Sequence, residues 1–225
     1  MIIAEVGTNH GGNMGIAKHL IHQAKVCKAD IVKFQLYDTD DIVPKNHSAY
    51  YDLKDAQLSR YQWEELVNEC ERDRIEFMAS VFDVERVSWC ESVNMKRYKI
   101  ASRSIYNQPL IDAVLKTGKP MIVSLGKMDA RGKPDLPAEY LYCVAKYPCP
   151  LSDLHLEKVD FTKYGFSDHT IGIEAAICAI ARGARIVEKH FTLDKTTEGH
   201  DHVCSMEPDE LHALVEFSKK WERMK

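Results

Sequence analysis

Gly165–Phe191 reads GFSDHTIGIEAAICAIARGARIVEKHF, and this stretch predicts the fold. Two short extended segments flank a helical pattern that a glycine ends. Such a strand–helix–strand unit places its two strands parallel. Because neighbouring strands lie about 5 Å apart, we expect His169 and His190, at the two strand ends, to face one another. Neutral imidazole is a common ligand of zinc, manganese and iron, so the stretch predicts an open metal site.

The same alternation of strand and helix runs through the whole sequence. The predicted strands are Ile2–Gly7, Asp30–Gln35, Glu76–Val81, Arg97–Ser102, Pro120–Gly126, Leu141–Ala145, Gly165–His169 and Arg185–Phe191. The predicted helices are Met14–Cys27, Tyr61–Arg72, Val84–Ser92, Pro109–Thr117, Ile173–Arg182 and Pro208–Met224. Eight such units predict one α/β domain over residues 1–225, a (β/α)8 TIM barrel. An open doubly wound sheet is the alternative, although no GxGxxG follows the first strand to indicate dinucleotide binding.

Two connections lack the pattern of a full helix. Lys127–Tyr140 contains prolines and glycine, and Leu151–Tyr164 is short. We therefore expect the helical layer to be reduced after strands five and six, where either another subunit or long loops cover the barrel. The long connection Asp38–Arg60, which contains His47, is a candidate lid.

Composition excludes several classes of function. The chain has 225 residues, of which 45% are hydrophobic, and a formal net charge of −4. This charge provides no general attraction for nucleic acid or an acidic membrane. No apolar run is long enough to span a bilayer, and a glutamate at position 5 argues against a signal peptide. Seven cysteines without CxxC spacing indicate reduced thiols, so we expect a cytoplasmic protein.

Polar side chains interrupt the predicted strands near their carboxyl ends, where (β/α)8 barrels carry their active sites. They are Glu5, Lys33, Gln35, Ser80, Lys99, Ser102, Ser124, Ser167 and Glu188. Isolated charges inside apolar strands are costly, so we expect these groups to converge. Lysines with serine hydroxyls suit a phosphate or a carboxylate. The alternatives are a buried lattice pairing Lys33 with Glu5 and Lys99 with Glu188, or a Schiff-base lysine.

Two loops at the same end carry further candidates. Asn9-His10-Gly11-Gly12 could bind hydroxyl groups, or could simply form a turn and helix N-cap. His200-Asp201-His202 could cover the metal site, although a solvated loop is the preferred interpretation on general grounds. The remaining histidines are expected at the surface: His19, His22, His155 and His212.

Several stretches together resemble the N-acetylneuraminate (sialic acid) synthase family. They include Ala4–Gly12, Val32–Gln35, Tyr98–Ser102, Tyr147-Pro148, Phe166–Thr170, Glu188–Thr192 and Ser205–Asp209. The match covers almost the whole chain, in order. The Ser-Asp-His-Thr and Lys-His-Phe-Thr elements are fairly specific in combination, and each is weak alone.

The resemblance implies a transferase that condenses phosphoenolpyruvate with an aldehyde sugar, such as an N-acetylmannosamine-like acceptor. The products would be a 2-keto-3-deoxy sugar acid, as in sialic acid biosynthesis, and phosphate. A divalent metal, typically Mn²⁺ with Mg²⁺ or Co²⁺ as alternatives, would bind His169 and His190, and Glu5 would be the third catalytic residue. The residues implied for phosphoenolpyruvate are Lys33, Ser80, Lys99, Ser102, Ser124 and Ser167. Gln35, Tyr147, Glu188 and Asp201 are weaker carry-overs to the surroundings of the acceptor and the metal. Asn9 and Arg103 are further candidates for the acceptor from their positions in the loops.

Three departures from the family pattern accompany this resemblance. We expect a barrel without the family's C-terminal antifreeze-like domain, so that its contact with the sugar is missing or is supplied by another protein, such as a separately encoded cap domain. A homodimer is expected as well. Arg103 and Ser104 replace a glycine and a sugar-contacting glutamate, which favours a more anionic acceptor. Ala145 replaces a polar residue, and Lys146 either compensates for it or lies at the surface. Two other functions stay open: a sugar-phosphate aldolase or isomerase, and a non-catalytic metabolite-binding barrel.

Overall fold

The computed structural model describes residues 1–224, which form a closed barrel of eight parallel strands in sequence order. The strands are β1 (Ile2–Gly7), β2 (Ile31–Leu36), β3 (Glu76–Val81), β4 (Tyr98–Ile100), β5 (Met121–Ser124), β6 (Glu139–Cys143), β7 (Gly165–Asp168) and β8 (Val187–His190). β8 pairs with β1 and closes the barrel. The predicted (β/α)8 barrel is therefore confirmed, and the open sheet is wrong.

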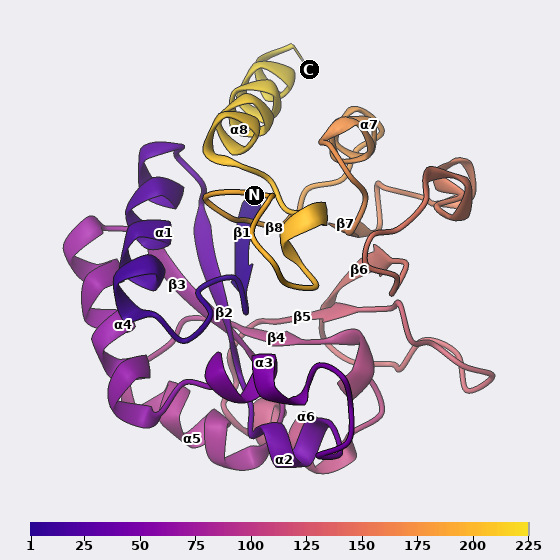
Figure 1. The fold of residues 1–225 in the computed structure, drawn as a ribbon. Coiled ribbons are helices and arrows are strands. Elements are labelled where there is room, and N and C mark those ends of the chain that lie inside the picture. Colours follow the sequence, from indigo (N-terminus) through magenta and orange to yellow (C-terminus); the bar gives the residue numbers. More distant parts are fainter. Residues whose placement is uncertain (225) are drawn as a thin grey trace.

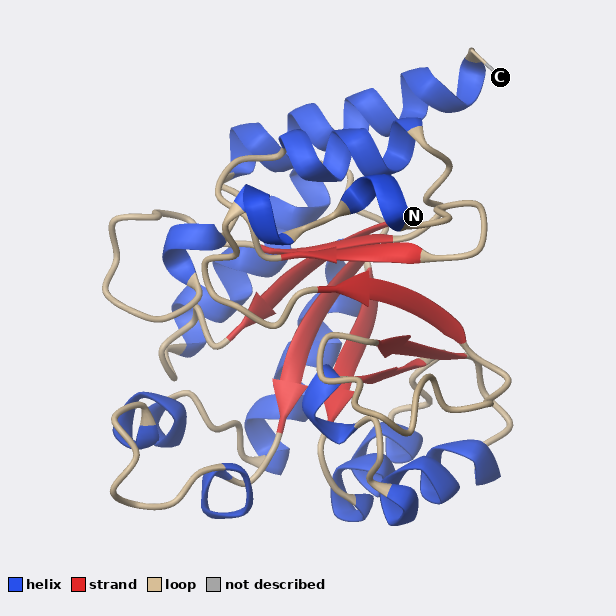
Figure 2. Ribbon diagram, turned by 90° about the vertical axis from the view of Figure 1, so that its right-hand side faces the viewer, coloured by secondary structure: helices blue, strands red, loops and turns tan. Residues whose placement is uncertain are grey.

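Helices surround the barrel on most sides (Figures 1 and 2). The long ones are α1 (Met14–Val26), α4 (Arg60–Asp73), α5 (Val84–Ser92), α6 (Gln108–Lys116), α7 (Glu174–Ala181) and α8 (Pro208–Arg223). Side chains cap the starts of several of them: Asn13 caps α1, Asp83 caps α5, Asn107 caps α6, and Ser59 forms a capping box with Gln62 on α4. All six predicted helices are confirmed to within a few residues.

The helical layer is reduced where the sequence predicts it. Apart from β6, the described chain between β5 and β7 has only loops and two 3-10 turns, η2 (Leu151–Asp153) and η3 (Leu156–Lys158). Figure 1 shows this side of the barrel between α6 and α7. The loop after β5 is attached to the barrel by Tyr140, whose hydroxyl accepts from the Leu136 amide at 2.9 Å. On this side, loops of the same chain therefore cover the barrel.

Local differences from the prediction have structural reasons. β4 is shorter than predicted because Ser102–Ser104 form a 3-10 turn, η1. β6 begins two residues earlier than predicted, and a backbone turn from Lys146 to Val144 ends the extended segment. The connection between β2 and α4 contains two short helices that the sequence pattern does not predict, α2 (Thr39–Ile42) and α3 (Tyr50–Asp55).

The inside of the barrel is built in two layers by the two-residue period of its strands. An apolar layer closes the amino end of the barrel: Ile3, Ile31, Met78, Ile122, Leu141 and Ile186. Two residues further along the chain from each of these lies a polar or thiol side chain: Glu5, Lys33, Ser80, Ser124, Cys143 and Glu188. The outward faces of the strands pack against the helices in the main core. The alternation therefore places a polar layer at the carboxyl ends of the strands.

None of the helices formed by residues 1–224 is both long and apolar enough to cross a membrane.

Candidate active site

Most of the predicted site residues meet in one small pocket at the carboxyl ends of the strands, with a volume of about 50 Å³. The predicted residues that line it are Glu5, Lys33, Gln35, Ser80, Lys99, Ser102, Ser124, Tyr147, Ser167, His169, Glu188 and His190. They come from all eight strands or the segments directly after them. We call this the inner pocket.

Two lysines and two glutamates form a buried ion-pair network in the inner pocket. Lys33 Nζ lies 2.7 Å from Glu5 Oε2 and 3.5 Å from Glu188 Oε2. Lys99 Nζ lies 3.6 Å from Glu188 Oε1. Both ion pairs expected for a buried lattice, Lys33 with Glu5 and Lys99 with Glu188, are therefore present. With neutral imidazoles, two ammonium groups and two carboxylates leave the pocket with no formal net charge.

Burial and charge shift the pKa of these groups in different directions. Burial disfavours the ammonium form of Lys33, but the carboxylates of Glu188 and Glu5 outweigh it and raise the pKa. Burial lowers the pKa of Lys99, which Glu188 only partly offsets. Burial also opposes the charge of Glu188, yet Lys33 and Lys99 hold its pKa below its usual range. Lys33 and Glu188 are therefore charged at neutral pH, and Lys99 is the lysine more easily deprotonated.

Serine hydroxyl groups complete the polar layer. Lys33 Nζ donates to Ser80 Oγ at 2.6 Å, and Ser167 Oγ donates to Glu188 Oε1 at 3.0 Å. Ser102 Oγ accepts from the Gly126 amide at 3.0 Å. The buried Ser124 Oγ has no hydrogen-bond partner among the described residues. A buried hydroxyl without a partner is unusual, so Ser124 is available to a ligand.

The two predicted imidazoles lie beside this layer and face one another. The ring centroids of His169 and His190 are 5.7 Å apart, with an interplanar angle of 39°. The residues before them, Asp168 and Lys189, are register partners in β7 and β8. His169 Nδ1 lies 2.9 Å from the Val144 carbonyl oxygen, which fits an N–H that donates to it and leaves Nε2 for a ligand.

The donor set fits an open metal site. The buried His190 Nδ1 makes no hydrogen bond within the described chain. No group of three or more His, Cys, Asp or Glu residues among positions 1–224 is arranged to hold a metal ion. A metal at this position would therefore have the two imidazoles as its protein ligands. Its other coordination positions would be open to water or substrate.

A wider outer cavity of about 480 Å³ lies next to the inner pocket. Gln35, Tyr147 and His190 line both spaces, so the two adjoin. The ring centroid of Tyr147 lies 4.2 Å from the ring centroid of His169 and 6.0 Å from that of His190. Three predicted acceptor residues, Asn9, Arg103 and Asp201, line the outer cavity and not the inner pocket.

The outer cavity contains one guanidinium without a carboxylate partner in the described chain. Arg103 is exposed, and its guanidinium donates to the Ile42 carbonyl oxygen of the connection after β2. Partial desolvation lowers the pKa of Arg103. The same connection, the candidate lid, contributes His47 to the cavity wall.

Two expectations about the loops are corrected by the structure. Asp201 Oδ2 lies 3.7 Å from His190 Nδ1 and 3.4 Å from Thr8 Oγ1, so this loop covers the site and is not simply solvated. Asn9 Nδ2 donates to the Phe191 carbonyl oxygen and to Ser205 Oγ, both at 2.9 Å, which joins the loops after β1 and β8. The NH2 group of Asn9 is therefore a structural link, whereas its buried Oδ1 has no hydrogen-bond partner among the described residues.

His10 belongs to the core and not to a hydroxyl-binding site. It is 1% exposed, and its Nδ1 accepts from the Gly12 amide at 3.1 Å. Burial lowers the pKa of His10 from 6.5 to about 4. The turn interpretation of this stretch is therefore correct. The N-cap of α1 is Asn13.

Cys143 lies in the site but is not among the residues predicted from the sequence. It lines the inner pocket, and its Sγ lies 3.7 Å from both His169 Nδ1 and Ser102 Oγ. The two-residue period of a strand does indicate its position, because Cys143 follows the interior residue Leu141 by two positions. Lys146 instead lies outside the pocket, where it pairs with Asp153 at 2.5 Å with its side chain 61% exposed. It does not compensate for Ala145.

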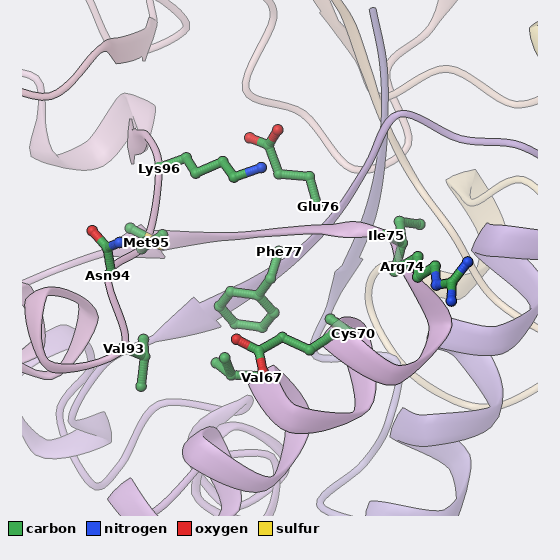
Figure 3. A pocket seen from close by; sticks show the side chains of 11 residues that line it. Val67, Cys70, Arg74, Ile75, Glu76, Phe77, Val93, Asn94, Met95 and Lys96 are labelled. Carbon is green, nitrogen blue, oxygen red and sulfur yellow. The ribbon is translucent and has the colours of Figure 1, made fainter.

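Another cavity, of about 370 Å³, lies at the opposite end of the barrel between α4 and the start of β3 (Figure 3). Phe77 and Cys70 form its floor, and Arg74 and Lys96 lie on its rim. It contains no histidine and no buried charge network. Among the described residues, the charged and imidazole side chains that converge on one pocket are therefore those at the carboxyl ends of the strands.

A closed parallel barrel with convergent charged and imidazole groups at this end is characteristic of (β/α)8-barrel enzymes. The chain belongs to the NeuB family, whose model matches residues 20–225. It is 34% identical to N,N'-diacetyllegionaminic acid synthase of Legionella pneumophila, over 96% of this chain and 70% of that protein. It is 38% identical to an uncharacterized protein of Methanocaldococcus jannaschii, over 99% of this chain and 71% of the relative.

The crystal structure of N-acetylneuraminic acid synthetase from Leptospira borgpetersenii has the same fold, with a TM-score of 0.93 and 33% identity. The match covers 99% of this chain and 84% of that one. A truncated 3-deoxy-D-arabino-heptulosonate 7-phosphate synthase from Thermotoga maritima has a TM-score of 0.74 at 13% identity, which shows a shared fold alone. The resemblance to sialic acid synthases is thus confirmed at the level of the family.

Proposed function

We propose that this chain catalyses the metal-dependent condensation of phosphoenolpyruvate with an aldehyde sugar. The observation that carries the proposal is the inner pocket, where His169 and His190 face one another beside Lys33 and Lys99. The product would be a 2-keto-3-deoxy sugar acid, and inorganic phosphate would leave. The synthases among the relatives support this class of product.

The lysines of the inner pocket would bind the anionic groups of phosphoenolpyruvate. Lys33 and Lys99 supply two ammonium groups, and Ser124 supplies a hydroxyl group without a protein partner. Ammonium groups fixed beside the phosphate would offset the charge that it gains as its C–O bond breaks. A divalent cation on His169 and His190, which we propose to be Mn²⁺, would supply Lewis-acid polarisation of the acceptor aldehyde.

Glu5 is the candidate general base. Its Oε1 accepts from Gln35 Nε2 at 2.9 Å and its Oε2 pairs with Lys33, so the carboxylate is held in one orientation. As C3 of phosphoenolpyruvate bonds to the aldehyde carbon, C2 becomes electron-poor and takes up water. Glu5 would accept the proton of this water, and the adduct would then lose phosphate.

The outer cavity would receive the acceptor, and its volume of about 480 Å³ suits a sugar. Arg103, which has no carboxylate partner in the described chain, would bind an anionic group of that acceptor. We therefore propose an acceptor with a phosphate or carboxylate at the end remote from its aldehyde.

A phosphate-release screen tests the proposal. Phosphoenolpyruvate and Mn²⁺ are offered with neutral N-acetylhexosamines and with their 6-phosphates. We expect phosphate release with at least one acceptor and a preference for the anionic ones. The Arg103→Met variant should lose this preference. No release with any acceptor, from protein shown to bind Mn²⁺, would contradict the condensation.

The metal assignment has its own test. His169→Ala and His190→Ala should each remove bound Mn²⁺ and turnover while the barrel stays folded by circular dichroism. Unchanged metal content in both variants would show that the histidines are not ligands. Borohydride trapping of a substrate adduct on Lys99, whose pKa burial lowers, would instead favour a Schiff-base aldolase.

A further inference from the structure

A fully buried ion pair lies immediately before the two histidines. Asp168 and Lys189 are register partners on β7 and β8, and both side chains are 0% exposed. Lys189 Nζ lies 3.1 Å from Asp168 Oδ2. The neighbouring Ser167 and Glu188 point into the barrel, so alternation turns Asp168 and Lys189 to the outer face of the sheet. The pair therefore lies outside the inner pocket and touches no candidate substrate position.

The contacts of this pair hold the backbone on both sides of His169. Lys189 Nζ also donates to the Thr170 carbonyl oxygen at 2.6 Å. Asp168 Oδ1 accepts from the Thr170 amide at 2.9 Å and from Thr170 Oγ1 at 2.8 Å. Asp168 and Thr170 flank His169, and both are thus bound to Lys189, the residue that precedes His190.

Stability alone is a poor explanation for this arrangement. Removing two charges from water costs several kcal/mol, and a well-packed apolar pair of similar volume is often as stable or more so. An apolar pair would, however, lack the directional contacts to Thr170. The property specific to the ion pair is a fixed position of His169 relative to β8.

We propose that Asp168 and Lys189 are positioning residues that set the separation of His169 and His190 and thereby the affinity of the site for a divalent cation. The inference rests on the metal site of the proposed function. Groups that orient metal ligands typically change affinity 10- to 100-fold when they are removed.

The test compares the stability of the metal-free protein with its affinity for Mn²⁺, measured from the electron paramagnetic resonance signal of the free ion. Lys189→Met leaves Asp168 buried without its partner, so it should lower both the melting temperature and the affinity. The double variant Asp168→Asn/Lys189→Met removes both charges and keeps an amide oxygen for Thr170. It should regain much of the melting temperature but still bind Mn²⁺ at least about tenfold more weakly than the parent.

Arg97→Met is the matched control, because Arg97 pairs with Glu76 at 2.6 Å, remote from the histidines. It should lower the melting temperature and leave the Mn²⁺ affinity unchanged. A double variant with parental affinity would overturn the positioning role while leaving the proposed function intact. If instead the parent binds no Mn²⁺, or binds it equally well as His169→Ala, the metal site of the proposed function fails and this inference fails with it.

Discussion

His10 shows how burial decides the chemistry of a single residue. Its sequence neighbours Asn9 and Gly11 place it in a candidate binding loop, yet its imidazole is buried and its pKa is lowered from 6.5 to about 4. The neutral ring accepts a hydrogen bond from Gly12 and packs 5.9 Å from the ring of Phe34. A residue of this kind stabilises the turn only while it remains uncharged.

His10 should therefore make the stability depend on pH. Between pH 6.5 and pH 4 the unfolded chain binds a proton at His10 and the folded chain does not. The free energy of unfolding should thus fall as the pH decreases through this range, by up to about 3 kcal/mol from this residue. His10→Gln should remove that part of the slope in urea unfolding at pH 7, 6, 5 and 4.5.

The exposed His19 supplies the control for this experiment, since His19→Gln should keep the parental slope. Identical slopes in His10→Gln and the parent would show that His10 is not held neutral by the fold.

At the scale of the element, the end of β1 determines how closely the polypeptide approaches the site. Gly7 has a φ of +56°, and a Cβ atom at this position would lie 3.1 Å from His190 Cε1 and 3.3 Å from Gln35 Nε2. The missing side chain lets β1 pass directly beside the imidazole. β1 therefore limits the positions that the His190 ring can take.

We expect Gly7→Ala to weaken Mn²⁺ binding as well as stability. The positive φ alone costs about 1–2 kcal/mol for a residue with a Cβ, and the contact with His190 would displace its ring. The melting temperature and the Mn²⁺ affinity are the two measurements. Gly118→Ala is the matched control, because Gly118 has a φ of +68° but nothing within 4 Å of its Cβ position. Equal Mn²⁺ affinity in both variants would contradict the contact argument.

At the scale of the whole molecule, the barrel balances its internal charges before any ligand binds. Lys33 and Lys99 are offset by Glu5 and Glu188, so the inner pocket has no formal net charge when the imidazoles are neutral. Phosphoenolpyruvate carries a carboxylate and a phosphate, which a neutral pocket attracts only weakly. A divalent cation on the histidines would add the missing positive charge.

Binding of phosphoenolpyruvate should therefore depend on the metal. We expect its affinity, measured by calorimetry, to fall at least about tenfold when Mn²⁺ is removed, which corresponds to about 1.4 kcal/mol of coupling. Reciprocally, phosphoenolpyruvate should tighten Mn²⁺ binding by the same factor. Equal affinity with and without Mn²⁺ would mean that the lysines alone provide the anion site.

The local pattern was sufficient to predict the barrel and much of the site. Alternation with a two-residue period placed Glu5, Lys33 and Glu188 inside the barrel, and the parallel unit around α7 predicted that the two histidines would face one another. These features depend on residues a few positions apart, or on the fixed geometry of neighbouring parallel strands.

Only the tertiary structure decided which neighbours those residues meet. The hydrogen bond between Asn9 and Ser205 joins residues 196 positions apart, and the contact between Arg103 and Ile42 joins residues 61 positions apart. The sequence alone could not tell that Lys146 lies outside the pocket, or that Cys143 Sγ lies 3.7 Å from His169 Nδ1. Contacts between distant segments are fixed by closure of the barrel and packing of its loops, and no local pattern records them.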